Sequence, residues 1–341
     1  MKNFLSFFAV ALFFSGGLFS QMKSEPFDIT IPDTVVKGSL YNRLTLVDKR
    51  TDTFSVGIIQ KGAFNKRVRI NTITPLQKQF SELLKYIIDS VSAKKGEMLL
   101  VLREFSFAEI TGAFGEKGYF HLRGNLFEKD GQLYTEISGV DTVLVVTGLD
   151  VTKKMLAKGS RFFTDFIVSS LKEEPKGCGQ FSFSQVDAID SIEKSKLPLY
   201  TVTDFKNGAY RDFNSFVNQV PDDTTLIINY SKNGVLKSIE AKKKNGKYTD
   251  VELNKWYAFA YNNRLFISAD YGVYPLEKKG DDFFFTGRAS VPANSGDVIA
   301  ASVFFGLIGV LAASGGSSAD FYMKIDHRGG GFIRIRKVTG K

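Results

Sequence analysis

The chain has 341 residues, of which 43% are hydrophobic, and a formal net charge of +9. This hydrophobic content is sufficient for packed cores, so it excludes a largely disordered protein, and the length favours two domains. The single cysteine, Cys178, excludes an internal disulfide, and we expect an unpaired thiol there. One cysteine and two histidines provide too few convergent ligands for a metal site, so we expect neither a metal nor another cofactor.

The N-terminal stretch "MKNFLSFFAVALFFSGGLFSQMKSEP" has the pattern of a secretory signal peptide. One lysine precedes an apolar run from Phe4 to Phe14, and small residues follow it. We expect residues 1–20 to be removed by cleavage near Ser20 or Gln21, with a retained membrane anchor as the alternative. Because no cysteine lies there, we expect no lipid anchor. The sequence therefore predicts an exported protein that is periplasmic or associated with the cell envelope.

The positive charge remains after export, because removal of Lys2 leaves 44 basic against 36 acidic residues, or +8. In an exported protein this excess favours anionic lipid headgroups or acidic glycans over nucleic acid. We therefore expect a membrane surface or an envelope protein as the partner and no nucleic acid. No motif identifies a small-molecule ligand.

Residues 30–172 are predicted to form an α+β domain. Apolar alternation predicts strands on either side of a helix whose apolar stripe runs from Leu76 to Val91. More strands follow, two of them joined by a turn at Asp130-Gly131, and a second amphipathic helix ends before Pro175. We expect the two helices to cover one face of a mostly antiparallel sheet, which would make an N-terminal two-helix sandwich.

Residues 173–200 are predicted to be a linker, because they mix Gly, Pro and charged residues without a sustained period. Residues 201–341 are predicted to be β-rich. Several runs alternate between apolar and polar residues, and turn-forming pairs such as Asn262-Asn263 separate them. We expect a meander or a small barrel with one apolar helix over residues 298–313.

The stretch "FKNGAYRDFNSFVNQVPDD" carries the spaced residues Gly208, Tyr210, Phe213 and Phe216. This motif resembles one in exported, uncharacterised proteins of Bacteroidetes-type bacteria. Those proteins continue with a Trp-containing strand, here at Trp256, then a Gly/Ala-rich apolar segment and a Gly-rich turn. The resemblance covers about residues 190–341 and implies export and an envelope setting, with no catalytic residues. The aromatic spacing itself predicts a short helix that packs on the sheet and ends at Pro221.

No catalytic motif is present, so we expect no catalytic residue. His121 alternates with apolar neighbours and is expected on the solvent face of a strand, and His327 lies in the turn "DHRGGG". Two carboxylate pairs are the remaining candidates: Glu104 with Glu109, and Asp281 with Asp282. They keep open a hydrolase of envelope polysaccharide, which needs only two suitably separated acids. Binding of an apolar ligand inside the Phe-rich second half is a further alternative.

Every residue from Val298 to Ala319 is uncharged, close to the end of a chain that is otherwise well charged. A helix over residues 298–313 would span about 24 Å, against about 30 Å of membrane hydrocarbon. We expect a helix that connects neighbouring strands, with a membrane span or an interfacial segment as alternatives. Small residues at Ser302, Gly306 and Gly309 would let its own domain or a partner approach closely. Taken together, the sequence predicts a non-catalytic envelope protein that acts by binding or assembly.

Overall fold

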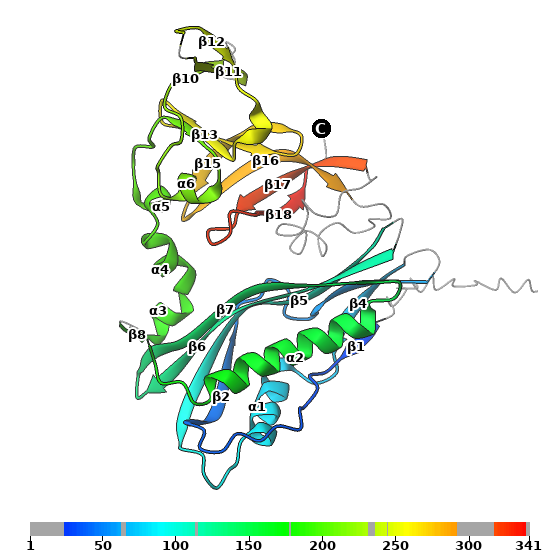
Figure 1. The fold of residues 1–341 in the computed structure, drawn as a ribbon. Helices are drawn as coiled ribbons and strands as arrows, with labels where there is room; N and C mark the ends of the chain where they lie inside the picture. Colours follow the sequence, from blue (N-terminus) through cyan, green and yellow to red (C-terminus); the bar gives the residue numbers. More distant parts are fainter. Residues whose placement is uncertain are drawn as a thin grey trace, which may run out of the picture.

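The computed structural model describes residues 24–62, 66–112, 115–176, 179–230, 236–243, 245–291 and 317–338. About 50% of these residues are in strands and about 20% in helices. The strands form sheets of eight, seven and three strands. Figure 1 shows the eight-stranded sheet with two long helices against it, and the seven-stranded sheet beyond its opposite face.

The eight-stranded N-terminal sheet has the strand order β1-β4-β3-β5-β6-β7-β8, and β2 also pairs with β5. Its strands are β1 (Ser24–Phe27), β2 (Tyr41–Asp48), β3 (Gly57–Lys61), β4 (Lys66–Thr72), β5 (Gly96–Gly112), β6 (Gly115–Asp130), β7 (Leu133–Gly148) and β8 (Gln180–Ser182). The long strands β5 to β7 curl the sheet into a half-barrel, because twist accumulates along their length. The pairing of β6 with β7 confirms the hairpin turn at Asp130-Gly131.

Helices α1 (Leu76–Ile87) and α2 (Thr152–Ser170) pack against one face of this sheet. Their apolar stripes supply buried rings, and Phe80 of α1 stacks on Phe163 of α2 with ring centroids 4.3 Å apart. Gly159 lets α2 approach the sheet, because a Cβ there would lie 2.8 Å from Cγ of Phe120. We call the face opposite α2 the outer face.

Between the two large sheets the chain forms α3 (Phe183–Asp187), α4 (Ile189–Ser195) and α5 (Pro198–Thr201). Val186 and Ile189 from the first two of these helices pack on Leu99 and Phe127 of the outer face. The region predicted to be a linker therefore contains a strand and three short helices, and part of it is docked on the N-terminal sheet.

The seven-stranded C-terminal sheet has the order β18-β17-β16-β15-β14-β13-β9, and a separate small sheet β10-β11-β12 packs on one face of it. Their elements are β9 (Gly208–Tyr210), α6 (Phe213–Val217), β10 (Leu226–Tyr230), β11 (Leu236–Lys242), β12 (Tyr248–Asp250), the 3-10 helix η1 (Leu253–Lys255), β13 (Ala258–Tyr261), β14 (Arg264–Ala269), β15 (Gly272–Lys279), β16 (Asp282–Val291), β17 (Ser317–Ile325) and β18 (Phe332–Lys337). All described pairs in both sheets are antiparallel.

The predicted fold class, an α+β chain with an N-terminal two-helix sandwich on an antiparallel sheet, is wrong. The chain is mostly β, and the described residues contain six α-helices. The N-terminal sheet is mixed, because β1 pairs in parallel with β4, and β2 and β3 pair in parallel with β5. Alternation of apolar residues predicts a strand but says nothing of the direction of its partner.

Three sequence predictions lie outside the described residues: the signal peptide over residues 1–20, the thiol of Cys178, and the apolar segment 298–313. The strands on either side of that segment are described, and they pair with each other. Val291 at the end of β16 lies opposite Ser317 at the start of β17. Among the described helices, none is both long and apolar enough to cross a membrane.

Candidate functional site at the junction of the two sheets

The outer face of strands β5 to β7 carries a band of charged residues. On β6, the residue Gly118 faces α2, since a Cβ there would meet Met155. Residues at odd positions on that strand therefore point outward, and they include His121 and Arg123. The strand register places Glu104 of β5 and Asp141 of β7 beside Arg123. Charged side chains thus occupy the middle of this sheet face.

The turn between β17 and β18 brings three more charged residues to this band: Asp326, His327 and Arg328. The turn is closed by hydrogen bonds from the Gly330 amide to the Asp326 carbonyl and from the Asp326 amide to the Gly331 carbonyl, each 2.8 Å. Gly330 has a φ of +71°, a conformation that glycine adopts without steric penalty. The helix α4 adds Asp190 and Glu193. We call the set Arg103, His121, Arg123, Asp141, Asp190, Glu193, Asp326, His327 and Arg328 the junction cluster.

Arg123 is the central link between the two sheets. Its Nη1 and Nη2 donate to both carboxylate oxygens of Asp326, at 3.1 and 2.5 Å, and its Nε donates to Asp141 at 2.9 Å. The Asp326 side chain is only 1% exposed. His121 donates to the second oxygen of Asp141 at 3.0 Å. The sequence prediction placed His121 on a solvent face, but the C-terminal sheet covers that face, and His121 is buried.

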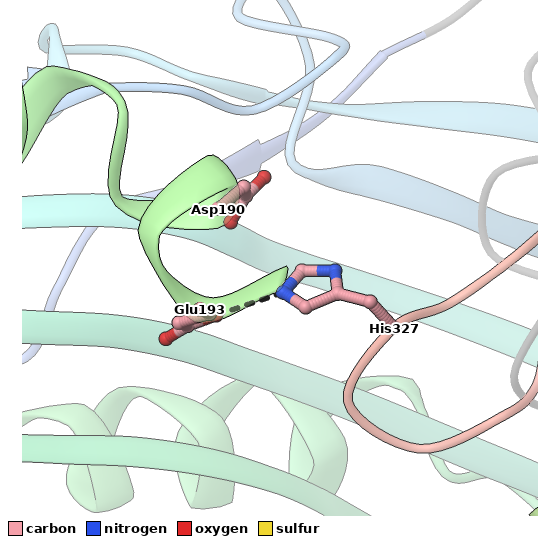
Figure 2. Close-up of side chains that lie close together, drawn as sticks. All are labelled: Asp190, Glu193 and His327. Carbon is pink, nitrogen blue, oxygen red and sulfur yellow. Dashed lines mark hydrogen bonds and ion pairs between the residues drawn. The ribbon is translucent and has the colours of Figure 1, made fainter. Parts of the chain in front are cut away.

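A second set of contacts joins α4 to both sheets. Figure 2 shows one of them, between Glu193 of α4 and His327 of the turn. Glu193 accepts a hydrogen bond from His327 at 2.8 Å, and Arg328 reaches its other oxygen at 3.1 Å. Arg103 of β5 donates through Nη1 to Asp190 and to Glu193, at 2.8 Å each. The helix is therefore held between a strand of one sheet and a turn of the other.

Asp190, Glu193 and His327 have the residue types of a metal site, and their ligand atoms lie within 4.8 Å of one another. No sequence pattern indicates this group, because His327 is far along the chain from the other two residues. However, Nη1 of Arg103 contacts a carboxylate oxygen of both Asp190 and Glu193. The guanidinium supplies the positive charge between the carboxylates, so the arrangement fits an ion-pair cluster better than a metal centre.

This interpretation gives a direct expectation for metal ions. We expect neither EDTA nor added Zn²⁺ to shift the thermal unfolding midpoint of the purified protein, because Arg103 already pairs with both carboxylates and Arg328 also pairs with Glu193. Differential scanning fluorimetry would measure the midpoint. A midpoint that rises with Zn²⁺ concentration, and no longer rises in a His327→Ala variant, would show that the three residues bind metal.

Two carboxylates of the cluster have strongly lowered pKa values. Burial by itself would raise the pKa of Asp141, but the hydrogen bond from His121 and the contact with Arg123 outweigh it and lower the pKa to about 2. Burial likewise opposes ionisation of Glu193, and hydrogen bonds from His327 and Arg103 lower its pKa to about 2. Both groups are therefore ionised and paired over the whole physiological pH range.

These pKa values predict that the junction weakens in acid. The unfolded chain has ordinary Asp and Glu pKa values near 3.9 and 4.3, above the folded values of about 2. The stabilisation is therefore complete above about pH 5 and is lost as the pH falls toward about 2. Urea unfolding between pH 7 and pH 3 should show a falling midpoint. The fall should be shallower in Asp141→Asn, which has no carboxylate to protonate at this position. If the variant and the parent chain have identical pH profiles, protonation of Asp141 does not cause the loss of stability.

A further group of carboxylates lies at the N-terminus of α2. A cavity of about 360 Å³ there is lined in part by Glu25, Glu109, Glu116 and Asp150. Glu116 accepts from the amide of Val151, and Asp150 accepts from the next amide. Helix N-termini favour negative charge. The positions of Glu116 and Asp150 are therefore accounted for by the helix, and no bound ligand is needed to explain them.

Neither carboxylate pair proposed from the sequence places two unpaired acids side by side. Glu104 points to the outer face, whereas Glu109 accepts a hydrogen bond from Thr152 of α2 on the opposite face of the sheet. Asp282 forms an ion pair with Lys194 of α4 at 2.6 Å, and Asp281 accepts from Ser191. Both acids of the second pair thus attach the C-terminal sheet to α4.

The aromatic motif lies directly behind the turn of the junction cluster. Tyr210 belongs to strand β9 and not to the predicted helix, which begins at Phe213 and carries Phe216. Phe213 packs against Tyr257, whose hydroxyl donates to the Gly330 carbonyl at 2.7 Å. The motif therefore supports the turn that carries Asp326 to Arg123.

The other motif residues hold the surrounding chain. Gly208 has a φ of +152°, and a Cβ there would lie 2.5 Å from Cβ of Pro221. This close approach brings the end of α6 back to β9. Trp256 lies on the other side of the C-terminal sheet, where the Arg211 guanidinium is 5.5 Å from its ring centroid. Ser302, Gly306 and Gly309 lie outside the described residues.

Replacing Gly330 with alanine should loosen the turn. A Cβ there would lie 2.7 Å from Cδ2 of Phe213 and closer still to Cγ and Cβ of that side chain, in addition to the strain of positive φ. We expect a loss of about 2–4 kcal/mol in unfolding free energy, measured by urea denaturation. Gly131→Ala is the matched control, since φ is +60° there but no atom lies within 4 Å. If the two variants lose the same unfolding free energy, the contact with Phe213 contributes nothing to the loss.

One feature of the sequence points to the junction cluster: polar residues repeat at every second position of β6. His121, Arg123 and Asn125 alternate with buried residues on β6, and all three are buried. Buried polar and charged residues are rare without partners. Three such residues at successive outward positions therefore indicate that partners from elsewhere in the chain cover this face. The partners themselves come from remote parts of the chain.

A scan against protein-family models finds no match, and a search of curated proteins finds none. Among solved structures, a protein from Xanthomonas campestris described as DUF330 is similar over 43% of this chain and 95% of its own, with 11% identity and a TM-score of 0.29. An uncharacterised protein is similar over 44% of this chain and 100% of its own, with 12% identity and a TM-score of 0.22. At such low TM-scores neither similarity assigns this chain a family or an activity.

Proposed function

We propose that the protein is an exported component of the cell envelope that acts by binding or assembly and not by catalysis. The proposal of export comes from the N-terminal sequence, in which one lysine, an apolar run and small residues follow one another as in a signal peptide. The partner that we propose is an envelope protein or an anionic membrane surface, in line with the net charge of +8 after cleavage, 44 basic less 36 acidic residues.

The observation that supports a non-catalytic function is that the charged residues of the junction cluster pair with one another. Its acids, histidines and arginines are the residue types of an active site, but they contact one another across the two sheets. Asp326 and His327 are both at least nine-tenths buried. A buried ion-pair network fixes the relative position of the parts it joins, which suits a rigid binding scaffold.

The alternative hydrolase needs two carboxyl groups that face one substrate. Neither pair proposed from the sequence meets this condition, because Glu104 and Glu109 lie on opposite faces of β5 and Asp282 is paired with Lys194. Incubation of the purified chain with peptidoglycan should release no reducing sugar. A release that Glu104→Gln or Glu109→Gln abolishes would favour the hydrolase.

Fractionation of a C-terminally tagged chain tests export. We expect the tag in the periplasmic or envelope fraction of a host with an outer membrane, and a mass that lacks residues 1–20. A chain without residues 2–20 is the control and should stay in the cytoplasm. An intact N-terminus in the cytoplasmic fraction would overturn the proposal. Proximity labelling from the exported chain would then identify neighbouring envelope proteins.

A further inference from the structure

The turn that follows α1 holds an apolar side chain away from the body of the protein. Val91 in this turn is 93% exposed. Asp89 fixes the turn, because its carboxylate accepts from the Val91 amide at 3.2 Å and from the Ser92 hydroxyl at 2.6 Å. The Ser92 hydroxyl accepts in turn from the Gly38 amide at 2.9 Å. Val91 is therefore displayed on a well-defined turn, and the described residues leave its side chain almost fully uncovered.

Two more exposed apolar side chains lie close to this turn. Tyr86, near the end of α1, is 62% exposed, and Val35 is 60% exposed. The stretch that carries Val35 runs beside the end of the helix, because Val36 forms a β-bridge with Ile88. Single exposed apolar residues are common on protein surfaces, whereas a group of them marks a contact surface.

Four exposed lysines accompany these apolar side chains: Lys37, Lys85, Lys94 and Lys95. The Lys94 amide donates to the Ser39 carbonyl at 2.8 Å, so Lys94 lies beside the stretch that carries Lys37. Residues 35–40 and 85–95 contain these four lysines and one aspartate, which gives them a net charge of +3. We call the three exposed apolar residues and the four lysines the α1 patch.

The acids near the α1 patch do not cancel this charge. Asp89 is the aspartate counted above, and its carboxylate is bound within the turn. Glu82 and Glu97, the next acids along α1 and β5, pair with other basic residues. Asp33, two residues before Val35, lowers the net charge of this surface only to +2. The patch therefore combines uncovered apolar side chains with an excess of positive charge.

We propose that the α1 patch is the surface through which the protein contacts an anionic membrane. Ammonium groups are attracted to anionic headgroups, and valine and tyrosine side chains gain free energy by entering the interface between headgroups and acyl chains. Figure 1 shows α1 on the side of the N-terminal sheet that faces away from the C-terminal sheet, so this contact leaves the junction cluster undisturbed. The inference rests on the proposed function, which includes such a membrane as a partner.

Co-sedimentation with lipid vesicles tests the lysines of the patch. The exported chain, purified by a C-terminal tag, is mixed with vesicles of phosphatidylglycerol and phosphatidylcholine at low salt. Each lysine near an anionic bilayer strengthens binding about fivefold, so Lys94→Ser/Lys95→Ser should lower the partition coefficient on the order of twentyfold. Lys242→Ser/Lys243→Ser is the matched control, because it removes the same charge from exposed positions beside the small sheet. This control should bind nearly as well as the parent chain.

A tryptophan at position 91 tests the apolar part of the patch directly. Val91→Trp keeps the backbone hydrogen bonds of the turn, and the site is exposed enough to accept the larger side chain. We expect its fluorescence to shift to shorter wavelength when the anionic vesicles are added, because the indole leaves water. Phe54→Trp is the control at a position that is 87% exposed elsewhere on the N-terminal domain, and its emission should not shift. Trp256 contributes equally to both proteins.

The outcomes separate this inference from the proposed function. If the parent chain binds the vesicles but the two double lysine variants bind equally well, a membrane is a partner and the α1 patch is not the contact surface. Unchanged emission of Val91→Trp on bound vesicles leads to the same conclusion. If the parent chain does not bind anionic vesicles at all, the proposed membrane partner is wrong, and the role of the patch is overturned with it.

Discussion

Replacing Arg123 with alanine should lower the unfolding free energy of the chain by about 3–5 kcal/mol. The substitution removes three hydrogen bonds and leaves the Asp326 carboxylate, which is 1% exposed, in the junction without its guanidinium. A buried charge that loses its partner retains the full desolvation penalty. Urea denaturation followed by tryptophan fluorescence would measure the loss, and the single Trp256 reports on the C-terminal sheet.

Two further variants separate this effect from a general loss of charge. Arg288 pairs with Asp320 on the surface, where the two side chains are 53% and 49% exposed, so Arg288→Ala should cost no more than about 1 kcal/mol. The double variant Arg123→Ala/Asp326→Ala should recover part of the loss, because the unpaired carboxylate is gone. If Arg123→Ala proves as mild as Arg288→Ala, the junction cluster does not hold the two sheets together.

Replacing Gly159 with alanine should destabilise the protein although alanine is the better helix former. Helix propensity alone favours alanine by about 1 kcal/mol. A Cβ at this position would, however, lie 2.8 Å from Cζ of Phe107 and from Cγ of Phe120, two rings in the tightly packed N-terminal core. Overpacking of this kind costs about 1–3 kcal/mol or more, so we expect a net lower midpoint in thermal unfolding.

Gly179 provides the comparison for that prediction. No atom lies within 4 Å of a Cβ built there, and its φ is outside the left-handed region, so Gly179→Ala should leave the midpoint nearly unchanged. A Gly159→Ala variant that is as stable as the parent would mean that α2 can move away from the sheet. In that case the close contact of the helix with Phe107 is not required for the fold.

The long helices and hairpins could be predicted from the sequence because their signals are local. Buried positions Phe80 and Phe163 fall on continuous apolar stripes, and α1 and α2 form there. The partner of a strand is not a local property. Strand β2 pairs with β5 across two intervening strands and a helix, and nothing in the alternation of β2 specifies that parallel partner. The curled mixed sheet was therefore missed.

The junction cluster could not be predicted for the same reason, because its residues come from even more distant parts of the chain. Arg123 and Asp326 are 203 positions apart, so no spacing rule connects them. The sequence placed His327 correctly in a turn beside Asp326 but gave no reason to bring that turn to β6. The aromatic motif was interpreted as packing within the C-terminal part, and its contact with Gly330 links that packing to the attachment of the two sheets.

The register of β16 and β17 limits how the chain can meet a lipid bilayer. Paired Cα atoms in antiparallel strands are about 5 Å apart, whereas one passage through a bilayer would separate Val291 from Ser317 by about 30 Å of hydrocarbon. Val291 and Ser317 must therefore lie on the same side of any bilayer. Because β17 also holds the turn that binds Arg123, a tag at the C-terminus reports the compartment of the N-terminal sheet as well.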